Sequence, residues 1–503
     1  YLADIYCKHT SRIQGQPTSR SQQACTMVPL DWLPVGCPRT HDTPTTPLTI
    51  NNRPIQNSNN ARILGVIIDS KLSFSDHFSQ LKTSTKHCLN FFKIMGSRRT
   101  KASRQTLIRI VHCWLVPKLL HGMVLFSNHL NKFNKLIAPV YNIAIKSSAG
   151  AFITSPTVST HCESGQLPFS QVIALNIIKT TLRILEKNIP YETLLKNANT
   201  AFKNITNSNI PTIQKLITTK DRPWTTPSVK IVKIFNYKDQ LNSIQCFQML
   251  TELLTTKYPN SHAIYTDGSV ANNAAGCGIY SSITKCAIKL PNFTSIFSVE
   301  AMAISLAADE AAIAGQHNII LTDSASVLKA LEHGKSNDPH IPAIEQSPNI
   351  NNITFCWVPS HLGIRGNEIA DSLANEGRRD KNKNDSPISR RDAVKYCETA
   401  LWSSWQALWD KEIDRFLRQI KKSTAAWYDL PSPSDQRIIS RLRIGHTRLT
   451  HAHLLENAPP PLCEYCGVTI TVRHLLIECP AYDQHRTTCQ LAHNLDEMLT
   501  KRD

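Results

Sequence analysis

The apolar positions between residues 258 and 378 fall into short runs that alternate with stretches of helical periodicity. Five runs have the length and composition of strands. The first ends at Asp267, and the others cover residues 278–280, 286–290, 318–322 and 353–358. Helices are predicted from Ser298, a candidate N-cap, to Gly315, a C-terminal stop, then through 327–331 and over 367–376. This order predicts an α/β fold, a mixed five-stranded sheet with flanking helices and a central first strand.

The segments on either side of this region are mainly helical in pattern. Apolar residues recur at helical spacing from Ser75 onward, and residues 107–126 and 173–185 continue the pattern. Residues 108–126 contain basic residues, histidines and a proline, so this run is too polar to cross a bilayer and we expect no membrane partner. In the tail, Trp402, Trp405 and Trp409 fall on one helical face, where a core stripe is favoured over a base-stacking role.

Four carboxylates stand near the ends of predicted elements in the α/β region. Asp267 and Asp323 follow apolar strands, whereas Glu300 and Asp371 are expected in the first turns of helices. Carboxylates that converge repel one another unless cations lie between them, and a pair of Mg²⁺ ions needs such oxygen ligands to act on a phosphodiester. The alternative is four unrelated surface acids, with Asp267 and Gly268 forming an ordinary turn.

A second cluster, in the tail, has the spacing of metal ligands. Among 15 cysteines, only Cys463 and Cys466, followed by His474 and Cys479, form a pattern, C-x2-C-x7-H-x4-C. Two thiolates two residues apart can hold one tetrahedral Zn²⁺, which a histidine and a third cysteine on a following helix complete. The other cysteines show no regular framework, which indicates a reducing, intracellular compartment. Whether this unit binds nucleic acid or only folds the tail is open at this stage.

The charge of the chain is unevenly distributed. The formal net charge is +18, yet residues 264–377 carry 5 Lys or Arg against 11 Asp or Glu, so this region is at −6 and the remainder at +24. An acidic module inside a basic chain fits a metal-dependent nuclease whose flanks hold a polyanion. The alternative is that the basic flanks are only solvated surfaces.

Residues 357–374 carry a specific resemblance. Together with the four acids in their order along the chain, they are similar to a type 1 ribonuclease H. The resemblance implies a ribonuclease H-like fold and hydrolysis of the RNA strand of RNA–DNA hybrids with two Mg²⁺ or Mn²⁺ ions. By the same resemblance Asp267 would bridge the ions and Asp371 would help to hold the one that activates water. Glu300 and Asp323 would hold the ion at the leaving oxygen.

The resemblance also suggests residues that assist catalysis and bind substrate. His361, before the last predicted helix, resembles the family's histidine for proton handling or product release. The expected substrate-binding residues, of which the first two would read the RNA 2′-hydroxyl, are Gly268, Ser269, Ser324 and Asn367. Many relatives carry Gln where this chain has Ala325, which puts one minor-groove contact in doubt.

Other segments resemble polyproteins of LINE-like (jockey-type, non-long-terminal-repeat) retrotransposons. Residues 64–74 resemble the segment after the polymerase palm, and residues 150–156 and 163–168 resemble the helical connection downstream of it. The cysteine cluster is similar to the zinc knuckle that ends many of these polyproteins. At the family's paired-Asp turn only Asp4 remains, because Ala3 stands in place of the first Asp. We therefore expect a fragment without reverse transcriptase activity, since polymerisation needs several carboxylates.

The predicted organisation has six parts. They are a reverse transcriptase remnant (1–202), a linker and helix (203–257), a ribonuclease H domain (258–378), a linker (379–391), a basic helical tail (392–455) and the zinc knuckle with a last helix (456–503). The expected partners are RNA–DNA hybrid and other nucleic acid, in the cytoplasm, the nucleus or both. Two alternatives are a catalytically inactive nucleic-acid-binding remnant of a decayed element and a zinc-stabilised interaction scaffold. The intact set of four acids favours the enzyme.

Overall fold

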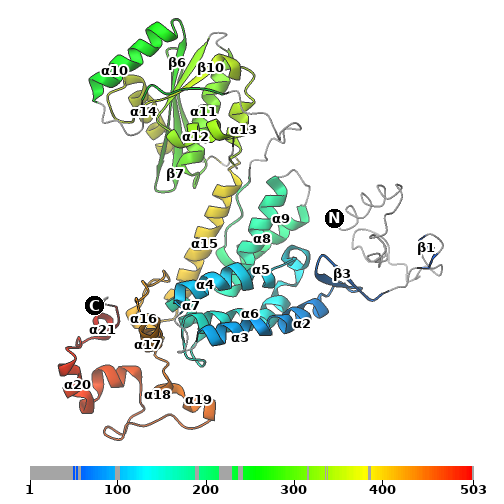
Figure 1. Cartoon of the computed structure of the whole chain (residues 1–503), viewed down its shortest axis with the longest axis vertical. Helices are drawn as coiled ribbons and strands as arrows, with labels where there is room; N and C mark the ends of the chain where they lie inside the picture. Colours follow the sequence, from blue (N-terminus) through cyan, green and yellow to red (C-terminus); the bar gives the residue numbers. More distant parts are fainter. Residues whose placement is uncertain are drawn as a thin grey trace. The chain divides into compact units, whose positions relative to one another are not determined.

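The computed structural model divides the chain into two compact units, residues 174–404 and residues 1–173 with 405–503 (Figure 1). The residues that it describes are 49–50, 53–54, 58–96, 102–186, 192–213, 229–235, 242–313, 317–334, 336, 338–382, 384 and 387–500. The predicted active-site turn with Ala3 and Asp4, and the predicted helix stop at Gly315, lie outside these residues.

The unit 174–404 is built on one sheet with the strand order β5-β10-β9-β6-β7-β8. The strands are β5 (Lys230–Val232), β6 (His262–Ala271), β7 (Ala274–Tyr280), β8 (Lys285–Leu290), β9 (Asn318–Thr322) and β10 (Ile353–Trp357). Strands β5, β10, β9 and β6 are paired in parallel, and β6, β7 and β8 are antiparallel. The prediction of a mixed sheet with a central first strand is therefore confirmed.

The prediction of five strands is wrong, because the sheet has a sixth strand, β5. This strand has only three residues, and Ile231 pairs with Phe355 of β10. A run of three residues is too short to show the two-residue period of a strand. Its conformation comes from pairing with the edge of a sheet that is built from residues far along the chain.

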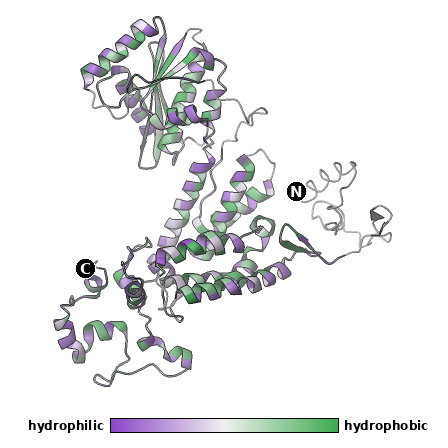
Figure 2. Ribbon diagram, viewed as in Figure 1, coloured by the Kyte–Doolittle hydropathy of each residue, from purple (hydrophilic) through white to green (hydrophobic). Residues whose placement is uncertain are grey.

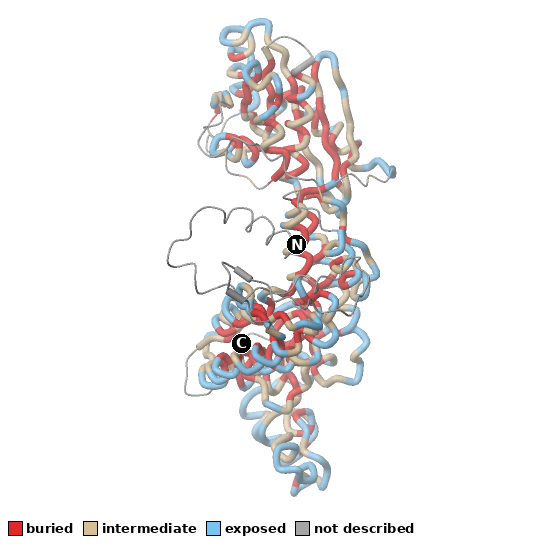
Figure 3. Tube along the Cα trace, turned by 90° about the vertical axis from the view of Figure 1, so that its right-hand side faces the viewer, coloured by how far each residue is buried: buried red, intermediate tan, exposed pale blue. Residues whose placement is uncertain are grey.

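Helices cover both faces of the sheet. They are α10 (Ser243–Glu252), α11 (Ile296–Ile313), α12 (Ala325–His333), α13 (His340–Glu345) and α14 (Arg365–Arg379). Successive side chains of a strand point to opposite faces. Ile320 of β9 accordingly packs in the core with α11, α12 and α13, whereas Ile319 and Leu321 pack with α10. Strands β7, β9 and β10 are buried along most of their length, whereas β6 and β8 are mostly half-buried (Figures 2 and 3).

Ser298 is not the N-cap of α11, as was predicted. The helix begins at Ile296, and the Ser295 hydroxyl accepts a hydrogen bond from the backbone N–H of Ser298 at 3.4 Å. The Ser298 hydroxyl instead donates to Asp338 Oδ2 at 2.7 Å. Two serines three residues apart carry the same local capping signal, and only the packing around the helix start selects between them.

The second unit contains a hairpin and a group of helices. Their bounds are β3 (Asn60–Ile63), β4 (Val66–Asp69), α2 (Ser75–Ser84), α3 (Lys86–Met95), α4 (Arg104–Ile110), α5 (Val116–Leu119), α6 (Leu130–Ser148) and α7 (Thr157–Ser164). The predicted helix 107–126 is interrupted, because Gly122 has a φ of 72° and a 3₁₀ helix follows at Met123–His129. Within the described residues no single helix has the length and apolarity of a membrane span; only the pair Arg104–Leu119 and Met123–Ser148, bent by 72°, does so together.

Three further helices are α8 (Phe169–Glu186), α9 (Glu192–Thr206) and α15 (Arg390–Asp410). The C-terminal helices are α16 (Phe416–Ile420), α17 (Pro433–Ile444), α18 (Arg448–His451), α19 (His453–Glu456), α20 (Asp483–Thr488) and α21 (Leu495–Thr500). Near the end of α15, Trp405 is 2% exposed and Trp409 is fully buried. The predicted core stripe is confirmed at these two tryptophans, while Trp402 is only partly buried.

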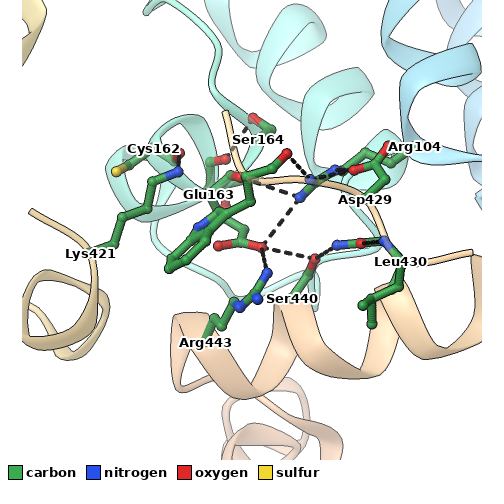
Figure 4. A network of polar contacts seen from close by, with 12 residues as sticks. Arg104, Cys162, Glu163, Ser164, Lys421, Asp429, Leu430, Ser440 and Arg443 are labelled. Carbon is green, nitrogen blue, oxygen red and sulfur yellow. Dashed lines mark hydrogen bonds and ion pairs between the residues drawn. The ribbon is translucent and has the colours of Figure 1, made fainter. Parts of the chain in front are cut away.

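A buried ionic cluster joins the C-terminal segment to α4 and α7 (Figure 4). Glu163 is fully buried, and its Oε1 lies 3.3 Å from Arg104 Nη1 and 3.6 Å from Arg443 Nη1. Ser440 of α17 donates a hydrogen bond to the same oxygen at 3.2 Å, and Lys421 Nζ donates to the Cys162 carbonyl at 2.9 Å. A carboxylate without water needs such partners, so the C-terminal segment folds together with the helices that precede residue 173.

Candidate active site and metal cluster

Asp267 lies inside a strand and not at a turn. Strand β6 continues to Ala271, and Asp267 pairs across the ladder with Gly278 of β7. The chain reverses only at Asn272 and Asn273, whose positive φ values of 50° and 64° suit a two-residue hairpin turn. The predicted strand end at Asp267, and with it the alternative of an ordinary Asp-Gly turn, is therefore wrong. The Asp267 backbone is held by the sheet.

Gly268 makes room for the side chain of Glu300. A Cβ atom on Gly268 would lie 2.9 Å from Glu300 Cγ and 2.9 Å from Val299 Cγ1, closer than real Cβ contacts allow. The backbone of Gly268 is extended in β6, so the glycine is required for close approach and not for its φ angle. Helix α11 can therefore bring Glu300 against the strand that carries Asp267.

Strand register places Asp323 beside Asp267. Strands β6 and β9 are parallel, and Thr266 pairs with Thr322, so the next residue along each chain is one of these two acids. Neighbouring strands lie about 4.8 Å apart. Asp267 lies inside β6 and Asp323 directly follows β9, so the register of this parallel pair sets the two acids on adjacent chain segments.

Glu300 and Asp371 occupy second turns of their helices, not the first turns that were predicted. Helix α11 begins at Ile296 and α14 begins at Arg365, so each acid lies more than one turn inside. The apolar pattern of the sequence shows where the first buried residue of a helix lies. In both helices the helical backbone begins before that position. Glu300 is the fifth residue of α11, whereas Asp371 is the seventh of the 15 residues of α14 and lies near the middle of that helix.

Glycines let α14 approach the sheet closely enough to deliver Asp371. A Cβ on Gly278 would lie 2.1 Å from the Ala370 carbonyl oxygen, and one on Gly276 would lie 2.1 Å from the backbone nitrogen of Arg378. From the helix side, a Cβ on Gly377 would lie 2.5 Å from the Ile288 carbonyl oxygen. Because Gly278 is paired with Asp267, this contact sets how near α14 comes to the Asp267 strand.

Three of these carboxyl groups, Asp267, Glu300 and Asp323, have raised pKa values. Burial, and then the negative charges of Asp323, Asp371 and Glu300, raise the pKa of Asp267 to about 8. Burial and the charge of Asp323 raise the pKa of Glu300 to about 7, and burial also raises the pKa of Asp323 above its ordinary value. The structure thus gathers the four acids into one pocket of unfavourable negative charge.

Each carboxylate has a hydrogen-bond donor of its own. The Gly268 N–H donates to Asp267 Oδ1 at 2.6 Å, and Asn375 Nδ2 donates to Asp371 Oδ1 at 2.9 Å. Hydrogen bonds from Ser324 to Glu300 and from Asn367 to Asp323 oppose the rise in the pKa values of those acids. Three of the four residues predicted to bind substrate, Gly268, Ser324 and Asn367, are thus bonded to the acids, and their contact with substrate stays a prediction.

His361 lies on the loop before α14 and is exposed to solvent. Its backbone has a φ of 56°, in the region that is uncommon for residues other than glycine, and Gly363 follows with a φ of 78°. The charge of His361 lowers the pKa of Asp323, which shows that the imidazole is near that carboxylate. An exposed histidine at the rim of the acidic pocket can exchange a proton with a reacting group.

Sequence reasoning missed Asn375 and Arg378. Arg378 Nε donates to Ser269 Oγ at 2.9 Å, and Arg378 Nη2 donates to Asn375 Oδ1 at 3.2 Å. The signal that could have found Asn375 is its position four residues after Asp371, where two helical side chains meet. Nothing local could have linked Arg378 to Ser269, which is 109 residues away in the sequence.

The cysteine cluster of the tail is assembled with the geometry of a metal site. One ligand atom from each of Cys463, Cys466, His474 and Cys479 lies within 4.8 Å of the others. The Cys479 sulfur is 3.8 Å from that of Cys463 and 3.7 Å from that of Cys466, and a hydrogen bond to His474 is the main cause that lowers the pKa of Cys463 to about 6. Three sulfurs and one imidazole, with a thiol already inclined to ionise, form a donor set compatible with Zn²⁺.

Comparison with known proteins finds a family match over one segment of the chain. The sequence model of the family described as RNase H matches residues 259–379. Among solved structures, RNase H1 from Halobacterium salinarum NRC-1 is 23% identical, covers 24% of this chain and 97% of its own, and has a TM-score of 0.20. LC11-RNase H1, isolated from compost by a metagenomic approach, is 21% identical over 24% of this chain and 96% of its own, with a TM-score of 0.21.

The protease-reverse transcriptase of Prototype Foamy Virus is 24% identical to this chain, with a TM-score of 0.22; the match covers 24% of this chain and only 21% of the viral one. A search of curated proteins finds no match. The mixed sheet with its flanking helices is the ribonuclease H-like fold that the sequence predicted, with six strands in place of five. Residues 259–379 of this chain are an RNase H domain.

Proposed function

We propose that this chain hydrolyses the RNA strand of RNA–DNA hybrids at the pocket formed by Asp267, Glu300, Asp323 and Asp371, with two divalent cations. The observation that carries the proposal is the convergence of the four acids, which strand register and the close contacts at Gly268 and Gly278 bring about; the raised pKa values of Asp267 and Glu300, about 8 and about 7, agree with it. A protein that buries carboxylates so close together loses stability unless cations neutralise them. The family match of residues 259–379 supports the same chemistry.

The donor set fits Mg²⁺ or Mn²⁺, because all four side chains supply carboxylate oxygens and these hard cations prefer oxygen ligands. Bound there, such cations lower the pKa of coordinated water and offset the charge of a phosphodiester. Asp267 is fixed by the strand ladder, Asp323 by Asn367 and Glu300 by Ser324, so the oxygens are held in place before a substrate arrives. His361, at the rim, is placed to take up or release a proton as the product leaves.

The test is cleavage of an end-labelled RNA strand in an RNA–DNA hybrid by the full chain. We expect cutting in Mg²⁺ and none with EDTA, and no cutting of a DNA duplex of the same sequence. Asp323→Asn keeps the shape of the side chain but removes a charge, so it should abolish cleavage while circular dichroism stays as in the wild type. Cleavage by Asp323→Asn at the wild-type rate would refute the assignment of the site.

The alternative function, an inactive nucleic-acid-binding remnant, predicts a different result. Such a protein would bind the hybrid with an affinity that falls steeply with salt, because the contacts are to phosphates, but it would not turn it over. The wild type alone separates the two functions when binding and cleavage are measured on the same hybrid. The four assembled carboxylates favour the enzyme.

We further infer that the chain derives from a LINE-like retrotransposon polyprotein and that its tail binds Zn²⁺. The support is the resemblance of residues 64–74, 150–156 and 163–168 to such polyproteins, together with the assembled Cys463 cluster. Nucleic acid would be the partner of the whole chain, whose net charge of +18 suits a polyanion. A primer-extension assay tests the expected absence of reverse transcriptase activity, and any template-dependent extension would contradict it.

A further inference from the structure

The side chain of Asn375 connects Asp371 to Ser269 of strand β6. Asn375 Nδ2 donates to Asp371 Oδ1 at 2.9 Å and to the Asp371 carbonyl oxygen at 3.0 Å. Its Oδ1 accepts from Ser269 Oγ at 2.9 Å and from Arg378 Nη2 at 3.2 Å. Both ends of the amide are therefore in use, and a rotation of the amide by 180° would place its NH₂ group against two donors.

Ser269 and Arg378 complete a closed set of contacts. Arg378 Nε donates to Ser269 Oγ at 2.9 Å, so the hydroxyl accepts from Arg378 and gives its own hydrogen to Asn375. Ser269 belongs to β6, two residues after Asp267 and on the same face, whereas Asn375 and Arg378 belong to α14. The contacts thus tie the strand of Asp267 to the helix of Asp371.

We propose that Asn375 is a positioning residue for Asp371, and that Ser269 and Arg378 hold Asn375 in the required orientation. Asn375 occupies one oxygen of the Asp371 carboxylate and leaves the other for a divalent cation. The inference rests on the proposed function only in taking Asp371 as a cation ligand. It gives the hydrogen of the Ser269 hydroxyl a structural partner, so this hydroxyl could meet an RNA 2′-hydroxyl only as an acceptor.

The expected loss of cation affinity follows from the effect of groups that hydrogen-bond metal ligands at other metal sites. Removing a group that hydrogen-bonds a metal ligand typically lowers metal affinity or activity by about 10–100-fold. Without Asn375, the Asp371 side chain would be free to rotate. Part of the free energy of cation binding would then be needed to order this side chain. The loss should therefore appear in cation binding itself, before any nucleic acid is present.

The experiment is isothermal titration of the full chain with Mg²⁺ in the absence of nucleic acid. Mg²⁺ is a hard cation and does not compete for the thiolates of the Cys463 cluster. Asn375→Ala should weaken Mg²⁺ binding by about 10–100-fold. Asn375→Gln, which keeps an amide within reach of Asp371 at the i,i+4 spacing, should recover most of the affinity. The control is Ser372→Ala, an exposed position on α14 next to Asp371, which should bind Mg²⁺ as the wild type does.

A double-mutant cycle distinguishes positioning from direct contact with RNA. Ser269→Ala alone should weaken Mg²⁺ binding less than Asn375→Ala does, and it should cause no further loss when added to Asn375→Ala, because it acts through that residue. Wild-type Mg²⁺ affinity in Asn375→Ala, or a full additional loss from Ser269→Ala in that background, would overturn the proposal. A wild type that binds Mg²⁺ but cuts no hybrid would instead overturn the proposed function.

Discussion

Replacing Asp267 by Asn should stabilise the cation-free protein, although it removes a residue of the candidate active site. Burial and three neighbouring carboxylates raise the pKa of Asp267 from 3.8 to about 8. The folded chain therefore keeps a proton at this position that the unfolded chain releases above pH 3.8. Stability from this group is full below the unfolded pKa and is lost as the pH rises through the folded pKa.

The size of the effect follows from the two pKa values. Each unit between them corresponds to 1.36 kcal/mol, so at pH 7, about three units above the unfolded pKa, the proton that only the unfolded chain has released disfavours folding by up to about 4 kcal/mol. The amide side chain of the Asp267→Asn variant cannot ionise and is free of this cost. The stability difference between variant and wild type should shrink to roughly half a kcal/mol at pH 4, where the unfolded chain has released only about half of this proton and the folded chain keeps it.

The assay is urea unfolding of the full chain in EDTA at pH 4 to 8, with hydrogen exchange of the β6 and β9 amides to report on the unit 174–404 separately. Adding Mg²⁺ should stabilise the wild type and leave the variant unchanged, because a ligand stabilises only the state that binds it. The control is Glu368→Gln, an exposed carboxylate in the first turn of α14, which should change stability by less than about 0.5 kcal/mol. The reasoning fails if Asp267→Asn is no more stable than the wild type at pH 7, or if the difference is the same at pH 4.

Three further predictions concern other parts of the chain. Gly278→Ala should reduce Mg²⁺ affinity and hybrid cleavage together, since its Cβ would lie 2.1 Å from the Ala370 carbonyl oxygen and displace α14; unchanged values in both assays would contradict the close-contact argument. Glu163→Gln should lower the free energy of unfolding by about 3–5 kcal/mol in urea titrations followed by circular dichroism, because Arg443 is left buried without its carboxylate and Arg104 keeps only Asp429; a loss below about 1 kcal/mol would mean that the cluster relaxes. Cys479→Ser should release zinc, measured by mass spectrometry of the native chain, and leave hybrid cleavage intact, whereas zinc retained in full would show that Cys479 is not a ligand.

The order of elements in the RNase H domain is readable from the sequence because strand and helix periods are local properties. The strand at Asn318–Thr322 has the predicted bounds, since its five residues are all buried and mostly apolar or β-branched next to a helix signal. The four acids and the cysteine cluster could likewise be predicted from the sequence, because the signal for each is residue type and spacing along the chain. Helix starts were misjudged by a few residues where, as at Ser295 and Ser298, two capping signals compete.

Other features depend on residues that meet only in the folded chain. Gly268 reads as part of a turn, yet its absent side chain is what admits Glu300 to the pocket. Strand β5 is too short to carry a signal and exists because β10 offers an edge to pair with. The link from Ser269 to Asn375 and Arg378 spans more than 100 residues, so no local pattern contains it.

The sequence by itself therefore determined which residue types this protein brings to its chemistry and the order of most elements that carry them, because both are written within windows of a few residues. The tertiary structure decided how close those elements come, which glycines permit the approach and which neutral side chains hold each acid. It also decided that Glu163 binds Ser440, 277 residues later in the chain, since burial and pairing of a charge depend on every chain segment around it.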